Sequence, residues 1–158
     1  MNAEDRLDWP RKGFSTRTRR VVRAAAEAIL ADLSDGGEII PGSPAACDRA
    51  VTALDHAVGR SSADLRRGFA VLSLLLEWLP LFLIGAWSRM SRLPIARRVR
   101  YLEALEAHRI GLFPMLLIAF KVPLCIPAFE EGEELALTGF DRPDTVARRR
   151  LRISEAPR

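Results

Sequence analysis

The hydrophobic positions of this 158-residue chain are concentrated in two long stretches. The first, FAVLSLLLEWLPLFLIGAW, covers residues 69–87, and the second, IGLFPMLLIAFKVPLCIPAF, covers residues 110–129. Each stretch approaches the roughly 20 residues of a membrane-spanning helix, but each also contains one charged residue, Glu77 or Lys121. A central lysine costs about 2.5 to 3.5 kcal/mol on membrane insertion, and the prolines leave carbonyls that lipid cannot hydrate. The pattern favours burial against protein, with contact to a membrane as the alternative.

Elsewhere the apolar residues recur at helical spacing, and capping residues predict where the helices begin. A first helix is expected from Ser15 or Thr16 to about Leu33, where the sequence SDGG at 34–37 stops it, and a loop follows. A second is expected from Pro44 to Val58. The third is capped by Ser61 or Ser62.

Proline positions predict the shape of the remaining helices. Pro80 should break or kink the third helix, because it removes a donor and clashes with the preceding turn. Pro94 should open a fourth helix that ends near residues 108–111. Pro123 and Pro127 should limit the last helix to about three turns.

These elements predict an all-α fold, a single-domain helical bundle of about five to six helices over residues 14–129. A flexible N-terminal arm over residues 1–13 and a C-terminal arm over residues 130–158, first acidic and then basic, flank the bundle. With 49% apolar and 28% charged residues, the composition is that of a globular protein.

The net charge of +4 comes almost wholly from arginine, which clusters at residues 17–23, 97–100 and 148–152. Such clusters are typical either of solvated helix faces or of surfaces for phosphate and acidic lipid. Most of the aromatic residues lie in the apolar stretches, and the three clusters contain none. We therefore favour solvated faces and expect no nucleic-acid ligand.

The N-terminus has acidic residues and no apolar segment of the kind found in export signals, so no signal peptide is predicted. We expect a cytoplasmic protein, with the inner face of the cell membrane as a second location. Cys47 and Cys125 are far apart and form no metal-spaced set, which is typical of free buried thiols.

Catalytic patterns do not emerge from the sequence. His56 and His108 each lie alone on a predicted helix, without a Cys, His or Asp at metal spacing. Glu77 is predicted to be a buried carboxylate, either paired internally with Arg66, Arg67 or Lys121 or used as an acid or interface anchor. We expect no catalytic residue, no metal ligand and no cofactor-binding residue in this chain.

Two segments resemble parts of known oxidoreductases. FSTRTRRVVRAAAEAILADLSDGGEIIPG, residues 14–42, resembles the start of the gluconate 2-dehydrogenase small-subunit family. Residues 87–144 are similar to the helical region that precedes the flavin domain in long-chain-alcohol oxidases of the glucose-methanol-choline class. Arg98, Leu102 and Lys121 match that pattern, as do the residues of its final motif, Gly139, Phe140 and Pro143.

The resemblance implies a non-catalytic accessory subunit of an FAD-dependent alcohol, sterol or sugar oxidoreductase. The flavin domain with its glycine-rich fingerprint is absent from the sequence, so FAD is expected on a larger flavoprotein partner. The alternative function is that of a membrane-associated helical protein whose basic clusters face lipid. Candidate residues of the partner interface are Trp78, Phe82, Trp87, Phe113, Phe120, Lys121, Phe129 and Phe140.

Overall fold

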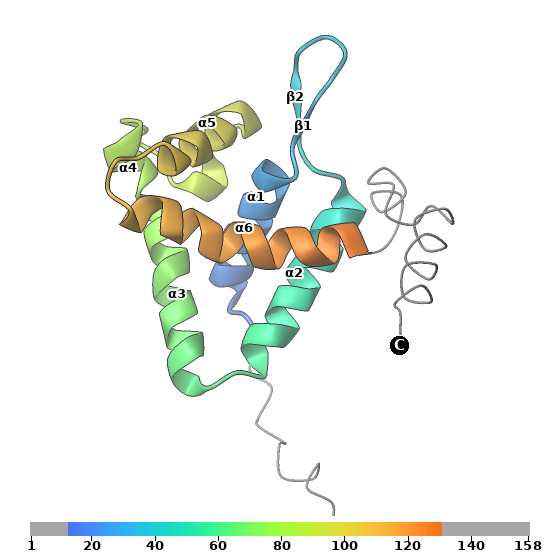
Figure 1. The fold of residues 1–158 in the computed structure, drawn as a ribbon, viewed down its shortest axis with the longest axis vertical. Coiled ribbons are helices and arrows are strands. Elements are labelled where there is room, and N and C mark those ends of the chain that lie inside the picture. The colour runs from blue at the N-terminus through green and yellow to red at the C-terminus, as the bar shows by residue number, and fades with distance from the viewer. Residues whose placement is uncertain (1–12, 131–158) are drawn as a thin grey trace, which may run out of the picture.

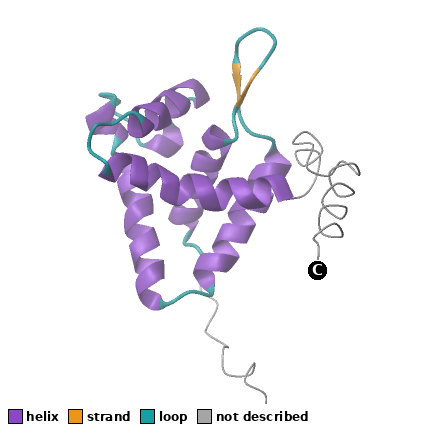
Figure 2. Cartoon of the chain, viewed as in Figure 1, coloured by secondary structure: helices purple, strands orange, loops and turns teal. Residues whose placement is uncertain are grey.

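The computed structural model describes residues 13–130 and shows the predicted all-α fold. Helix α6 lies across the bundle, while α2 and α3 extend from beneath it and a small hairpin projects away (Figures 1 and 2). The predicted arms, apart from Gly13 and Glu130, lie outside the described residues. The elements in chain order are α1 (Thr16–Ile29), β1 (Asp32–Leu33), β2 (Ile39–Ile40), α2 (Pro44–Gly59), α3 (Ala63–Trp78), α4 (Pro80–Leu83), η2 (Met90–Arg92), α5 (Ile95–Glu106) and α6 (Leu112–Glu130).

Serine side chains cap the first three helices. Ser15, Ser43 and Ser62 each accept a hydrogen bond from the backbone N–H three residues further on. Each bond satisfies one of the N–H groups that a helix leaves unpaired at its start. The predicted beginnings of these helices are therefore confirmed.

The predicted end of the first helix at Leu33 is wrong, because α1 ends at Ile29. Asp32 and Leu33 instead pair with Ile40 and Ile39 in an antiparallel hairpin. Its turn contains Gly37 at a φ of 76°, a conformation that favours glycine. Leu33 is consequently exposed on the hairpin and not buried on the helix.

The hairpin returns the chain tightly against the end of α1. The Gly42 N–H donates to the Glu27 carbonyl over 3.0 Å. A Cβ at Gly42 would lie 2.5 Å from the Leu30 Cβ, a distance that no side chain allows. Gly42 is thus required where β2 leads into α2.

Pro80 breaks the first apolar stretch, as predicted, since α3 ends at Trp78 and the single turn of α4 begins at Pro80. Proline lacks the N–H that would otherwise bond the carbonyl four residues earlier, that of Leu76. The hydroxyl of Tyr101, a residue of α5, donates a hydrogen bond to this carbonyl over 2.9 Å. A buried side chain from a distant helix therefore compensates for the proline.

The prediction that prolines limit the last helix to about three turns is wrong. Helix α6 continues through Pro123 and Pro127 for 19 residues. Leu116, Leu117, Phe120, Leu124 and Ala128 anchor one side of it along this whole length, and all five are buried. Tertiary packing of one face supplies most of a helix's stability in a protein, so it outweighs two missing hydrogen bonds.

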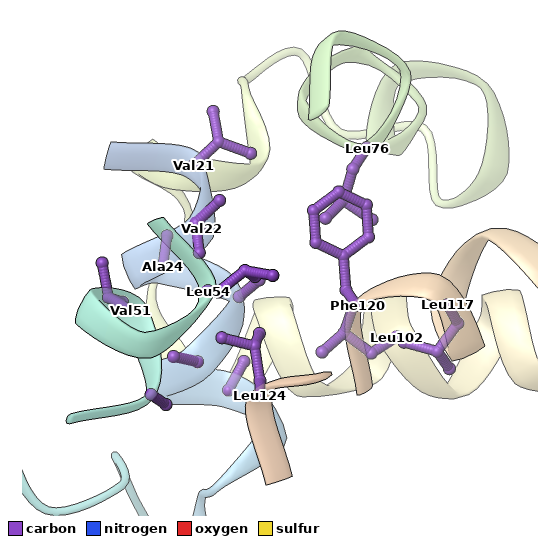
Figure 3. Packing of buried hydrophobic residues seen from close by; sticks show 14 of the residues in the cluster. Val21, Val22, Ala24, Val51, Leu54, Leu76, Leu102, Leu117, Phe120 and Leu124 are labelled. Atoms are coloured by element: carbon purple, nitrogen blue, oxygen red, sulfur yellow. The ribbon is translucent and has the colours of Figure 1, made fainter. Parts of the chain in front are cut away.

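The core lies beneath α6, where the buried side chains of five helices meet. Figure 3 shows Val22 of α1, Leu54 of α2 and Leu76 of α3 on the side of the cluster toward the α6 side chains, with Val21 of α1 and Val51 of α2 further from them. Phe120 lies at the centre, with its ring 5.1 Å from that of Phe69. The ring of Phe14 also stacks on that of Phe69, at 5.3 Å, which ties the start of α1 to α3.

Candidate functional site: the outer face of α6

The side of α6 that faces away from the core is as apolar as the side that faces it. Five exposed apolar residues, spaced three or four apart, line this side, so they form one stripe. We call this stripe the α6 outer face; it consists of Met115, Ile118, Val122, Ile126 and Phe129. A helix that is apolar all round is typical of one buried on every side, and here the bundle covers only one side.

Charged residues border the α6 outer face without entering it. Lys121 lies on the flank of α6, and its ammonium group forms a 3.2 Å ion pair with Glu106 of α5. Glu130 follows Phe129 at the exposed end of the helix. An apolar centre with a polar border of mixed sign is the usual anatomy of a protein–protein interface.

Helix α6 is also the helix that, by length and composition, would suit a membrane span in the described part of the chain. Its inner face, however, packs on α1, α2 and α5. To enter a bilayer the helix would have to leave this packing and take Lys121 with it. The observed arrangement therefore presents one face of α6, and not the whole helix, to a neighbouring surface.

The predicted interface residues separate into three groups within the described residues, and one further residue lies outside them. Phe82 and Trp87 are 84% and 97% exposed, and Trp78, Lys121 and Phe129 also reach the surface. Phe113 is half-buried against the core and meets the His108 ring edge-on at 4.3 Å. Phe120 is 0% exposed, which corrects its assignment to the interface: it is a core residue. Phe140 lies outside the described residues.

The aliphatic members of the α6 outer face are not among the interface residues predicted from the sequence, which apart from Lys121 are aromatic. A signal for them was present in the sequence. Once Phe120 and Leu124 are taken as the inner side, Ile118, Val122 and Ile126 fall on the opposite side of a 3.6-residue helix. An apolar residue at every one of those positions is not expected of a solvated helix face.

Glu77 is buried, as predicted, but its predicted pairing with Arg66, Arg67 or Lys121 is wrong. Its carboxylate accepts two hydrogen bonds from Ser91, one from the backbone N–H at 3.0 Å and one from the hydroxyl at 2.7 Å. Arg66 instead donates to the Ser61 carbonyl, and Arg67 pairs with Asp64. Glu77 therefore joins α3 to η2, and its role is structural.

Arg98, which matched the oxidase pattern, has a similar role. Its guanidinium donates to the Leu93 carbonyl over 2.7 Å and to Glu27 of α1 over 2.6 Å. Leu102, the second matching residue of that helix, is buried in the core. Both residues hold α5 and the segment after η2 against α1, so they shape the bundle.

The described residues offer little for catalysis. No group of three His, Cys, Asp or Glu side chains within residues 13–130 lies close enough to hold a metal ion. Cys47 is buried, and burial raises the pKa of the half-buried Cys125, which disfavours the reactive thiolate. Buried Asp55 accepts from the Phe14 N–H and pairs with Arg19, which fixes the start of α1.

Comparisons with protein families, with curated proteins and with solved structures found no match for this chain. The α6 outer face is a feature of the described residues that the folding of a single chain does not explain by itself.

Proposed function

We propose that this chain is a non-catalytic accessory subunit of an FAD-dependent alcohol, sterol or sugar oxidoreductase. In this proposal the α6 outer face binds the catalytic flavoprotein, which carries the FAD. The single observation that supports binding is the row of exposed apolar side chains opposite the core side of α6. The nature of the partner rests on the resemblance of residues 14–42 and 87–144 to small subunits and leader regions of flavin oxidoreductases.

The chemistry of the surface agrees with a permanent protein partner. Met115, Ile118, Val122 and Ile126 are each about half exposed or more, at 62%, 47%, 51% and 55%. Continuous exposed apolar area of this kind marks interaction sites on soluble proteins. A flavoprotein that packs on α6 would remove these side chains from water and exclude solvent from its own matching surface.

The test is co-expression of the chain with a flavoprotein encoded next to it. We expect a complex that elutes as one species in size-exclusion chromatography, with the flavin absorbance in the same peak. The double variant Ile118→Gln/Val122→Gln should weaken the complex at least about tenfold, because centrally buried apolar residues dominate interface energetics. Circular dichroism should remain unchanged.

A matched control is available on the hairpin. Leu33→Gln/Ile40→Gln also replaces two exposed apolar side chains, 67% and 48% exposed, but at a surface remote from the α6 outer face. This control should bind the flavoprotein like the wild type. Equal binding by both double variants, or elution of all flavin apart from this chain, would contradict the proposal.

A further inference from the structure

A second exposed surface lies on α4 and on the turn that joins α4 to η2. Phe82 and Trp87 are the two most exposed aromatic residues of the described chain, at 84% and 97%. Aromatic side chains seldom stand fully in water, because each of them gains by burying a large area. Neither residue contributes to the core, so the bundle itself does not explain them.

The turn that displays these residues is held firmly. The Ile84 and Ala86 N–H groups both donate to the Pro80 carbonyl over 3.2 Å, and Gly85 takes a φ of 60°. Ala86 is buried directly before Trp87, and Met90 is buried shortly after it. Phe82 and Trp87 therefore project from a fixed support.

Arginines surround this turn, and the first acidic residue after them in the sequence is the exposed Glu103, three residues beyond Arg100. Residues 79–102 contain five arginines and neither Asp nor Glu. Arg97 and Arg100 line a surface pocket of about 430 Å³ together with residues 83–86 of the turn. Within residues 13–130 neither of these two guanidinium groups forms an ion pair, whereas Arg98 is engaged by Glu27. Arg89 lies 4.7 Å above the Trp78 ring.

We propose that this corner, defined by Phe82, Trp87, Arg97 and Arg100, binds the surface of an anionic lipid bilayer. Phe82 and Trp87 would enter the headgroup region, where aromatic side chains are favoured. Arg97 and Arg100 would lie on lipid phosphates, and a basic residue near an anionic leaflet favours binding measurably. The occupant is a bilayer because Phe82 and Trp87 are almost fully exposed beside two guanidinium groups, those of Arg97 and Arg100, that form no ion pair within residues 13–130.

This inference is independent of the flavoprotein proposal, since it uses other residues and is tested on the full chain alone. The measurement is co-sedimentation with vesicles of pure phosphatidylcholine and with vesicles in which about one third is phosphatidylglycerol. We expect binding to the anionic vesicles, weak binding to the neutral ones, and release as salt is raised.

Two double variants test the two parts of the corner. Phe82→Ser/Trp87→Ser and Arg97→Gln/Arg100→Gln should each reduce binding to anionic vesicles about tenfold. Ile118→Gln/Val122→Gln serves as the control and should bind vesicles like the wild type. These positions are exposed, so the variants should fold, which circular dichroism would verify.

Tryptophan quenching by brominated lipid gives a second measurement. Trp87→Phe should lose most of the quenching, whereas Trp78→Phe should retain it. Equal binding to neutral vesicles, or corner variants that bind like the wild type, would overturn the proposal. Loss of the flavoprotein complex in the corner variants, without vesicle binding by the wild type, would also overturn it and assign the corner to a protein partner.

Discussion

Glu77 and Lys121 occupy comparable places in the two apolar stretches, near the middle of each, but their environments differ. Glu77 is 3% exposed and is held by two hydrogen bonds from Ser91. Lys121 is at the surface and pairs with Glu106, which is itself exposed. In the first stretch the charged side chain points into the core, and the helix breaks at Pro80. In the second stretch the charged side chain lies on the flank of α6, which continues as one helix.

The difference shows that the position of a charged residue within an apolar stretch does not determine whether its side chain faces the core or the solvent. In α3 the inward position is possible because η2 brings two donors to the carboxylate. In α6 the lysine lies between an apolar inner face and an equally apolar outer face. Both stretches keep exposed apolar side chains: the second exposes one face of α6, and the first exposes Val71, Leu74, Leu75 and Trp78 of α3 as well as Phe82 and Trp87. The buried carboxylate of the first stretch in addition connects α3 to η2.

Substitutions on the two faces of α6 should show the largest contrast. Phe120→Ala removes a fully buried ring from the centre of the core, and we expect a loss of about 3 to 5 kcal/mol in the free energy of unfolding. Val122→Ala, on the outer face two residues away, should change it by less than about 0.5 kcal/mol. Urea denaturation followed by circular dichroism measures both. Equal losses would show that the outer face is covered within the chain.

Substitution of the buried Glu77 in the first stretch should have the next largest effect on stability. Glu77→Ala leaves the Ser91 N–H and hydroxyl without their acceptor, and we expect a loss of about 2 to 3 kcal/mol in the free energy of unfolding. Glu77→Gln keeps an acceptor oxygen at the same place and should lose less. A Glu77→Ala protein as stable as the wild type would contradict the structural role of this residue.

Tyr101→Phe removes the hydroxyl that bonds the Leu76 carbonyl beside Pro80. We expect a loss of about 1 to 2 kcal/mol at neutral pH, because that buried carbonyl then has no donor. The comparison variant Phe113→Leu changes a half-buried ring that takes no part in this hydrogen bond, and it should lose less free energy of unfolding. Thermal or urea unfolding at pH 7 gives both values.

The same hydroxyl predicts a pH dependence. Burial, and secondarily the charge of Glu77, raise the pKa of Tyr101 above its ordinary value of 10.0. Above about pH 10 the unfolded chain releases the Tyr101 hydroxyl proton, whereas the folded protein retains it. This group therefore leaves the free energy of unfolding unchanged below pH 10 and lowers it as the pH rises further. The wild type should lose stability above about pH 10 more steeply than Tyr101→Phe. Parallel curves would refute this.

The surface pair of the second stretch should have the smallest effect. A double-mutant cycle of Lys121→Ala and Glu106→Ala should give a coupling of about 0.5 kcal/mol or less, because both partners are exposed and water screens them. The coupling should decrease further in high salt. A coupling as large as the loss in Glu77→Ala would remove the distinction between the two stretches.

Local signals in the sequence determined much of the fold. Ser15, Pro44 and Ser62 marked where helices begin, and Pro80 marked the break between α3 and α4, because caps and prolines act on their own turn of backbone. The all-α class follows from the same local patterns. The proposed flavoprotein partner, in contrast, comes from resemblance and remains a prediction.

Only the tertiary structure decided which side each residue faces and where local signals are overridden. Packing of α6 on three helices carries it through Pro123 and Pro127, and hairpin pairing ends α1 before Leu33. Phe120 and Val122 are both apolar neighbours of Lys121 in sequence, but one is in the core and the other is in water. The sequence contains the hydrophobicity of each position; burial depends on contacts between distant segments, which only the assembled bundle provides.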